Sequence, residues 1–357
     1  MRDIVILGST GSIGVQALEV IAANPELFRV VGLSAGGNNL TLLAKQVRDF
    51  NVPIVGVSSG AQELKSSLSG VKVIDGSGAS EQIASLTCDL VLNAITGSIG
   101  LAPTLAALAS GNKVALANKE SLVAGGDLVM AYGSEKIIPV DSEHSALFQA
   151  MSAGRVSDVS KLILTASGGP FRDRQDLSQV KLADALAHPT WSMGPVVTIN
   201  SATLVNKGLE IIEAHYLFSI AYSKIEAVIH PQSIVHSLVE FKDGSTLAQA
   251  SPPDMKGPIA YALAYPNRVG GAMAPINWNS KQSWEFEPID EKRFPAVQLA
   301  RRAGALGSSV AAIYNAANEV AVAAFMKEEI AFTAIVDTIE KVVDKLSATA
   351  PSKIRDI

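Results

Sequence analysis

The stretch IVILGSTGSIG, residues 4–14, decides the fold of the first part of the chain. Ile4–Leu7 is an apolar run typical of a buried strand, and the glycine-rich turn Gly8–Gly14 follows it directly. The pattern of residues 15–23 predicts a helix after the turn. Strand, glycine turn and helix in this order are the context of a dinucleotide-binding turn, where a pyrophosphate approaches the helix N-terminus. The spacing is G-x-x-G-x-x-G, so a tight turn without a ligand is the alternative.

The next predicted strand, residues 28–33, ends in the sequence SAGGNN at residues 34–39. A protein that binds NAD usually has Asp or Glu at this point, which holds the ribose 2′-hydroxyl. No acid is present here. Because a carboxylate would repel a 2′-phosphate, its absence favours NADP(H), although no Arg or Lys stands at the strand end either.

The order of predicted elements indicates the fold class. Strand and helix patterns alternate to about residue 149 and predict a doubly wound α/β domain. Further on, residues 234–241 and 245–250 flank an Asp-Gly pair and predict a β-hairpin. Alanine-rich helical patterns follow at residues 296–303, 310–327 and 333–346. We therefore expect an α/β protein with an N-terminal Rossmann-like NADP-binding domain, a central α+β domain and a small C-terminal helical domain, at residues 1–149, 150–276 and 277–357, the last including a connector.

Composition excludes several classes of protein. The chain of 357 residues is 48% hydrophobic and 18% charged, which allows a sizeable core. A net charge of -5 argues against nucleic acid as the main partner, because an acidic surface repels phosphate backbones. The single cysteine excludes a disulfide framework, and no uninterrupted apolar stretch is long enough to span a bilayer. The chain enters a strand at once, without a leader, and we expect it in the cytoplasm.

Two carboxylates, Asp141 and Glu143, follow the apolar run Lys136–Val140. If the extended geometry of a strand persists, its period of two makes both side chains project the same way. Two acids so close repel each other unless a cation lies between them, and Mg²⁺ and Mn²⁺ prefer oxygen ligands of this kind. The alternative is a helix start, with Ser142 as the N-cap and the acids favoured by the helix dipole.

Other polar clusters are candidates for ligand contact. Asn118–Ser121 lies at the carboxyl end of a predicted strand, where ligands gather in open α/β sheets, although ordinary helix capping explains it equally. Ser167 beside two glycines suits either a phosphate site or a turn. The segment His188–Gly194 predicts a loop, and its Trp191 makes it a candidate lid or a loop anchored in the core.

A helical pattern covers Ser201–Glu210. Asn206 and Glu210 share a helix face at i, i+4, and Lys207 lies beside them. Ser201, Asn206 and Lys207 suit a phosphate pocket, and Glu210 offers a third carboxylate; a solvated Lys-Glu pair is the alternative. His230 and His236 lack metal-ligand spacing, so we interpret both as supporting residues.

These segments occur together in one order: GSTGSIG at 8–14, NKES at 118–121, VDSEH at 140–144, SGGPF at 167–171, HPTWSMG at 188–194, NKGLE at 206–210 and HPQS at 230–233. In that order they closely resemble the 1-deoxy-D-xylulose 5-phosphate reductoisomerase family, over nearly the whole chain. The resemblance implies a rearrangement and NADPH-dependent reduction of 1-deoxy-D-xylulose 5-phosphate to 2-C-methyl-D-erythritol 4-phosphate, in non-mevalonate isoprenoid precursor biosynthesis. It also implies a homodimer through the central, catalytic domain, with no nucleic acid or membrane partner.

The resemblance implies a role for each candidate residue. One Mg²⁺ or Mn²⁺ would bind to Asp141, Glu143 and Glu210, which with Lys119 form the catalytic set. The substrate phosphate end would contact Ser167, His188, Ser201, Asn206 and Lys207. Lys119 and Ser142 would contact the hydroxyketone end, where the metal ligands Glu143 and Glu210 also meet the substrate, and Trp191 and Met193 would close over it. NADPH would contact Thr10, Gly11, Ser12, Ile13, Gly36, Gly37, Asn38, Asn118, Glu120 and Gly194.

The sequence departs from the family pattern at two places. Many relatives have a basic residue where Gly37 stands, and the family usually continues past Ile357 with a further helix. Two other functions are open: a simple NAD(P)-dependent sugar or semialdehyde dehydrogenase without rearrangement, and a non-catalytic NADPH-sensing module. Neither would need Asp141, Glu143 and Glu210 together, so the three acids favour the metal-dependent enzyme.

Overall fold

The computed structural model describes residues 1–346, and within them the chain forms two compact units. The first unit comprises Met1–Ser121, Leu128–Asp141 and Met255–Met273. The second comprises Leu122–Asp127, Ser142–Asp254 and the described residues from Ala274 onward. The expected domain boundaries at residues 149 and 276 stay predictions.

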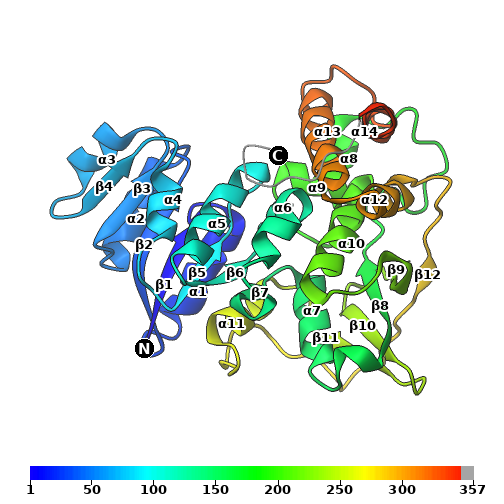
Figure 1. Cartoon of the computed structure of the whole chain (residues 1–357), viewed down its shortest axis with the longest axis horizontal. Helices are drawn as coiled ribbons and strands as arrows, with labels where there is room; N and C mark the ends of the chain where they lie inside the picture. Colours follow the sequence, from blue (N-terminus) through cyan, green and yellow to red (C-terminus); the bar gives the residue numbers. More distant parts are fainter. Residues whose placement is uncertain (347–357) are drawn as a thin grey trace. The chain divides into compact units, whose positions relative to one another are not determined.

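The first unit contains a parallel sheet whose strands, within the described residues, run in the order β4-β3-β2-β1-β5-β6-β7 (Figure 1). Leu7 at the end of β1 pairs with Ser34 of β2 on one side and with Asn93 of β5 on the other. The strand order reverses at this point, which is where open α/β sheets bind ligands. The predicted Rossmann-like sheet is therefore confirmed; its strands are β1 Arg2–Leu7, β2 Phe28–Ala35, β3 Ile54–Val57, β4 Lys72–Asp75, β5 Leu90–Asn93, β6 Lys113–Leu116 and β7 Ile137–Pro139.

Helices connect and cover these strands. The apolar strand Ile4–Leu7 has no exposed surface, as expected for the centre of a sheet covered on both faces. A later segment returns to this unit: Lys256 pairs with Glu19 of the first helix at 2.6 Å, and the Arg2 guanidinium donates to Leu263 O at 3.0 Å. The helices are α1 Ser12–Ala22, α2 Leu40–Asp49, α3 Ala61–Ser67, α4 Ala79–Ala84, α5 Leu101–Ala109, α6 Glu120–Met130, whose middle belongs to the second unit, and α11 Lys256–Ala264.

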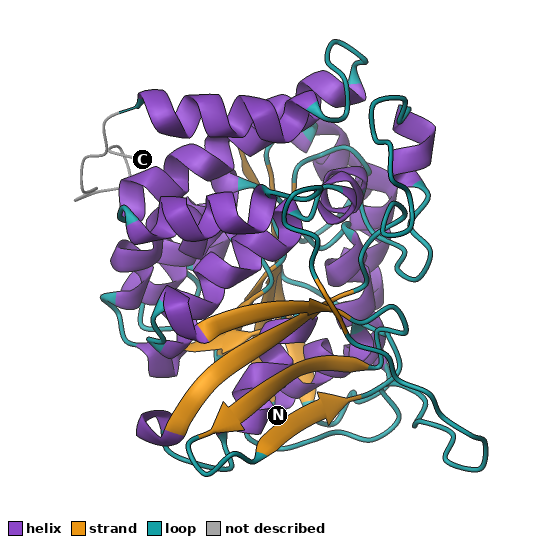
Figure 2. Cartoon of the chain, turned by 90° about the vertical axis from the view of Figure 1, so that its right-hand side faces the viewer, coloured by secondary structure: helices purple, strands orange, loops and turns teal. Residues whose placement is uncertain are grey.

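The second unit is built on a mixed sheet with the strand order β11-β10-β8-β9-β12 among the described residues. The predicted hairpin is confirmed, since β10 and β11 pair antiparallel through the turn at Asp243 and Gly244. Helices α7 and α10 pack against the sheet, and Figure 2 shows the strands with helices behind them. The bounds are β8 Val159–Ala166, β9 Ile225–Ile229, β10 Val235–Phe241, β11 Thr246–Ala250, β12 Glu287–Pro288, α7 Ser142–Met151, α8 Leu182–Leu186, α9 Pro195–Ala202 and α10 Val205–Phe218.

Three further helices, α12 Ala296–Ala305, α13 Ser308–Met326 and α14 Ala334–Lys345, match the predicted helical segments. Helix α12 packs closely on α10, where a Cβ on Gly208 would lie 2.7 Å from the Cβ of Ala300. By length and composition alone, the window Ser309–Met326 of α13 could cross a membrane. Half of that window is buried, and α13 packs against α12 and α14, so it serves as a core helix of this unit.

Candidate active site

The glycine turn lies at the end of β1 in the first unit. Gly8 has a φ of +77°, and a Cβ on it would lie 2.7 Å from Ala94 O. A Cβ on Gly14 would lie 2.4 Å from Gly8 O, so a side chain at either position would collide with backbone. Helix α1 begins at Ser12, and amides of a first turn have no partner inside their helix. The predicted cofactor residues Thr10–Ile13 therefore lie where backbone N–H groups can face an anion, although the Gly11 amide itself donates to Gly8 O at 3.0 Å.

The turn after β2 contains the predicted cofactor residues Gly36, Gly37 and Asn38. Gly37 has a φ of +108°, and a Cβ there would lie 2.5 Å from Ser59 O. A basic side chain at this position would collide with the neighbouring backbone, so glycine is the residue that fits here. Helix α2 begins directly afterwards, capped by the Asn39 side chain, which accepts from Leu42 N at 3.0 Å.

The carboxyl ends of β6 and β7 bring two predicted residues together. Lys119 Nζ lies 2.5 Å from Asp141 Oδ2, and both side chains are nearly buried. The neighbouring Asn118 donates through Nδ2 to Ile95 O at 2.7 Å and to Glu120 Oε2 at 2.8 Å. Asn118 thus ties the turn after β5 to the start of α6, while Lys119 neutralises a predicted metal ligand.

The structure decides between the two geometries considered for Asp141 and Glu143. Strand β7 ends at Pro139, and α7 begins at Ser142, so the extended conformation does not persist to Glu143. Glu143 lies in the first helical turn, where an acid is favoured by the helix dipole. The helix-start interpretation is therefore right, although Ser142 is the first helical residue rather than the cap.

Helices α7 and α10 bring two predicted metal ligands together inside the second unit. Lys207 Nζ lies 2.8 Å from Glu143 Oε1 and also contacts Glu210 Oε2. Asn206 Nδ2 donates to the other oxygen, Glu210 Oε1. A carboxylate oxygen of Glu143 lies within 4.8 Å of one of Glu210. Lys207, expected at the substrate phosphate, thus contacts the carboxylates in this structure.

The protonation of Lys207 shows that the carboxylate cluster stabilises a positive charge. Its burial favours the neutral amine, but the charges of Glu143 and Glu210 outweigh that effect, and the pKa of Lys207 is raised. The two carboxylates therefore enclose a place that favours a positive charge. Their oxygens are hard donors of the kind that Mg²⁺ and Mn²⁺ prefer, so the donor set fits a divalent cation.

A buried pair that the sequence analysis missed lies behind this cluster. His144 Nε2 donates to the backbone carbonyl of Glu210 at 2.9 Å, and its Nδ1 lies 3.3 Å from Glu213 Oε2. Both side chains are at most 1% exposed. The pair ties the first turn of α7 to α10 and thereby fixes Glu143 relative to Glu210. The i, i+3 spacing of Glu210 and Glu213 was the available signal, but nothing near His144 in the sequence indicates its partner.

Ser167 and His188 form a second group in this unit. His188 Nδ1 accepts from Thr190 N at 3.1 Å and from Trp191 N at 2.9 Å. The proton must therefore be on Nε2, which donates to Ser167 Oγ at 3.0 Å. Because burial lowers the pKa of His188, the ring stays neutral. Gly169 N also donates to Ser167 Oγ at 3.2 Å, which leaves the hydroxyl proton for a ligand.

The remaining candidates surround this group. The turn at Gly169 packs on the end of α9, since a Cβ there would lie 3.0 Å from Ser201 O. The loop before α9 has no regular structure; it holds Trp191 and Met193 half-buried and ends at the exposed Gly194. The Trp191 ring lies 6.1 Å from the His236 ring. The structure thus assembles two groups in the second unit, one of Glu143, Asn206, Lys207 and Glu210 and one of Ser167, His188 and Ser201.

The two later histidines hold backbone. His230 Nε2 accepts from Ile234 N at 3.1 Å and Val235 N at 3.0 Å, and Nδ1 donates to Glu285 O at 2.8 Å. His236 Nε2 lies 3.0 Å from Ser251 Oγ, and burial lowers the pKa of His236 to about 4. Both side chains therefore fix the strand β10 that flanks the loop of Trp191.

Three family models match the chain in sequence order. The model described as 1-deoxy-D-xylulose 5-phosphate reductoisomerase matches residues 4–126. The model of the C-terminal domain of the same enzyme matches residues 137–218. A model described as DXP reductoisomerase C-terminal domain matches residues 250–357.

Relatives and solved structures extend these matches over the whole chain. A 1-deoxy-D-xylulose 5-phosphate reductoisomerase from Mycobacterium marinum is 56% identical over 360 residues, covering 99% of this chain and 89% of that protein. One from Kitasatospora griseola is 55% identical over 95% of this chain and 91% of its own length. The Zymomonas mobilis enzyme in complex with NADPH has a TM-score of 0.93 and 39% identity, covering 99% and 94% of the two chains. A DOX-P reductoisomerase in complex with NADPH, fosmidomycin and magnesium has a TM-score of 0.92 and 39% identity, covering 97% and 90%.

Proposed function

This chain belongs to the 1-deoxy-D-xylulose 5-phosphate reductoisomerase family, and we propose that it converts 1-deoxy-D-xylulose 5-phosphate into 2-C-methyl-D-erythritol 4-phosphate. The reaction rearranges the carbon skeleton to a branched aldehyde, which takes a hydride from NADPH and a proton. It uses NADPH and a divalent metal, as the complexes of similar structures do. The observation that carries the proposal is that the carboxylates of Glu143 and Glu210 both contact the buried ammonium of Lys207.

We infer that Asp141, Glu143 and Glu210 bind one Mg²⁺ or Mn²⁺. Glu143 and Glu210 already enclose a positive charge, and Asp141 stands two residues before Glu143 in the chain. When bound, the cation supplies Lewis-acid polarisation of the substrate ketone and orients its oxygens. Lys119, paired with Asp141, and Ser142, at the first residue of α7, would contact the hydroxyketone end of the substrate.

The phosphate of the substrate fits the group around Ser167. The hydroxyl of Ser167 has a proton to donate, and His188 holds that hydroxyl in place. Ser201 lies at the end of α9 next to the same turn. Asn206 and Lys207 of α10, which contact the carboxylates in this structure, would add an amide and a cation to the phosphate contacts. Trp191 and Met193, on the loop before α9, would exclude water from the reacting fragments.

NADPH fits the turns of the first unit. The amides of Thr10–Ile13 would bind its pyrophosphate at the start of α1, and Gly36, Gly37 and Asn38 would lie at its 2′-phosphate. Backbone and amide donors would bind that phosphate, because Ser59 leaves no room for a basic side chain at position 37. Asn118, Glu120 and Gly194 complete the proposed cofactor contacts.

We also propose a cytoplasmic homodimer. The single cysteine, Cys88, is compatible with a reducing compartment. Strand β11 lies at the edge of the second sheet and is largely exposed, which makes the central domain a suitable interface. Light scattering on the purified protein measures the mass of the assembly directly, and a monomer at working concentration would contradict the dimer.

One assay tests the function. Purified protein is mixed with NADPH, 1-deoxy-D-xylulose 5-phosphate and Mg²⁺ or Mn²⁺, and NADPH oxidation is followed with and without a chelator. We expect oxidation that stops with the chelator, and a branched product by NMR. Oxidation that survives the chelator, with an unbranched product, would instead identify a simple dehydrogenase.

A further inference from the structure

Gln46 on α2 makes two hydrogen bonds to Ser9 in the glycine turn. Gln46 Nε2 donates to Ser9 O at 2.8 Å, and Gln46 Oε1 accepts from Ser9 Oγ at 2.8 Å. The two residues are 37 positions apart, and neither is more than 5% exposed. Both hydrogen bonds are thus shielded from water, where losing a partner leaves a buried polar group unsatisfied.

Ser9 is held on its other side by β2. The amides of Gly8 and Ser9 both donate to Ser34 O, at 2.9 and 3.0 Å. The amide, the carbonyl and the hydroxyl of Ser9 all have protein partners, so its polar groups serve the shape of the turn. Of the amides that follow, that of Gly11 donates to Gly8 O at 3.0 Å, and those of Thr10, Ser12 and Ile13 are the ones presented to a pyrophosphate.

Helix α2 also begins at the other end of the cofactor site. Its cap, Asn39, directly follows Gly36–Asn38, the segment proposed to lie at the NADPH 2′-phosphate. Gln46 stands two turns further along the same helix. The helix therefore connects the pyrophosphate turn to the 2′-phosphate turn, and Gln46 makes that connection by two hydrogen bonds.

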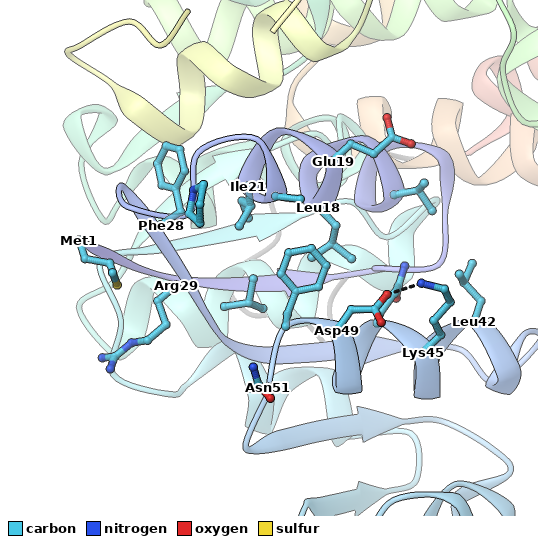
Figure 3. Close-up of a pocket in the computed structure, with 16 residues that line it drawn as sticks. Met1, Leu18, Glu19, Ile21, Phe28, Arg29, Leu42, Lys45, Asp49 and Asn51 are labelled. Atoms are coloured by element: carbon cyan, nitrogen blue, oxygen red, sulfur yellow. Dashed lines mark hydrogen bonds and ion pairs between the residues drawn. The ribbon is translucent and has the colours of Figure 1, made fainter. Parts of the chain in front are cut away.

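The buried Gln46 also borders a cavity. Gln46 lines a cavity of about 700 Å³ between α1 and α2, together with apolar residues such as Leu18 and Leu42 (Figure 3). Its two hydrogen bonds to Ser9 fix the position of its amide group. Leucine is close to glutamine in volume, so this apolar replacement does not overpack the core.

We propose that Gln46 is a positioning residue for NADPH, which holds Ser9 so that the amides of Thr10, Ser12 and Ile13 are preorganised for the pyrophosphate. This inference rests on the proposed NADPH-dependent function. It assigns Gln46 no contact with the cofactor; its effect passes through Ser9 and the spacing of the two turns.

The test measures NADPH affinity by fluorescence titration of the full chain, alongside thermal unfolding. We expect Q46L to weaken NADPH binding by about tenfold, the order expected when a buried hydrogen-bond pair is lost. S9A should weaken it about threefold, because the bond to the Ser9 carbonyl remains. The double variant should be no weaker than Q46L alone, since both act through one interaction. At saturating NADPH, the KM for the sugar phosphate should stay within about twofold of the wild-type value.

Asn112 provides the matched control. It is a buried amide in the same unit, and its Nδ2 donates to Ala84 O at 3.0 Å and Leu86 O at 2.8 Å. Ala84 and Leu86 precede β5 and therefore lie near the amino ends of the parallel strands, whereas the glycine turn lies at the carboxyl end of β1. N112L should lower the unfolding temperature and leave NADPH affinity unchanged.

Two results would overturn the proposal. One is a Q46L variant that unfolds earlier, as N112L does, but binds NADPH like wild type. The other, decisive if Q46L does not fold, is a folded S9A variant with unchanged NADPH affinity. Wild-type protein that binds no NADPH would contradict the proposed function itself, and the role of Gln46 would fall with it.

Discussion

At the scale of single residues, Lys207 balances the charge of the candidate site. Its ammonium lies between Glu143 and Glu210, and it is 3% exposed. In metal-free buffer, Lys207→Met should lower the free energy of unfolding by about 3–5 kcal/mol, the range for breaking a buried ion pair. Urea unfolding measures this change, and added Mg²⁺ should restore part of the loss.

The control for this variant is Lys161→Met. Lys161 also pairs with two glutamates, Glu226 at 3.2 Å and Glu240 at 3.7 Å, but this cluster is partly exposed. The same substitution there should cost at most about 1 kcal/mol, as is usual for surface pairs. Equal losses in the two variants would show that burial of the Lys207 cluster does not matter.

Trp191 tests the loop before α9. The residue is half-buried, with its ring beside His236 and outside regular secondary structure. We expect Trp191→Ala to raise the KM for the sugar phosphate by about tenfold, since a large aromatic contact with the ligand is lost. NADPH affinity should change by less than about twofold in the same titration. Parallel loss of both would point to a folding defect.

His236 makes a prediction about pH. Burial lowers its pKa to about 4, so below the usual histidine pKa the unfolded chain takes up a proton that the folded protein does not. Stability should therefore fall as the pH drops from about 6.5 to 4, by about 3 kcal/mol from this residue. His188 adds to the same trend, because burial lowers its pKa too. Urea unfolding of His236→Gln should show a shallower dependence on pH, and identical slopes would contradict the assignment.

At the scale of elements, local patterns predicted most of the fold. The β1 turn, the Asp243–Gly244 hairpin and the three helices after residue 295 follow from short-range rules and are present in the structure. The junction of β7 and α7 was left open, because Asp141–Glu143 suits either a strand end or a helix start. Only packing of α7 on the second sheet decides between them, and packing is not visible in a short stretch of sequence.

Gly14 tests the glycine turn as an element. A Cβ on Gly14 would lie 2.4 Å from Gly8 O and 2.5 Å from the Ser9 Cα, and backbone cannot move aside. Gly14→Ala should destabilise the protein by at least about 2 kcal/mol and weaken NADPH binding. Gly78→Ala is the control: that Cβ would meet nothing within 4 Å, and the φ of -86° suits alanine. A thermal scan separates the two, and a Gly14→Ala protein as stable as wild type would reject the close approach.

At the scale of the whole molecule, contacts between residues far apart in the chain could not be predicted from local sequence patterns. The family resemblance implied that Glu143 and Glu210 are partners, and in the structure both contact the ammonium of Lys207. The His144–Glu213 and Gln46–Ser9 pairs were not predicted, because each joins residues 69 or 37 positions apart with no local signal. Such contacts depend on how whole elements pack, which a pattern of neighbours does not encode.

Metal binding by the three acids tests the central claim most directly. Mn²⁺ is titrated into wild-type protein and into Glu210→Gln, with electron paramagnetic resonance measuring the free ion and NADPH titration verifying the fold. We predict one Mn²⁺ site in the wild type and none in Glu210→Gln at the same concentrations, with NADPH affinity unchanged. A Glu210→Gln protein that binds Mn²⁺ with wild-type stoichiometry and affinity would contradict the account.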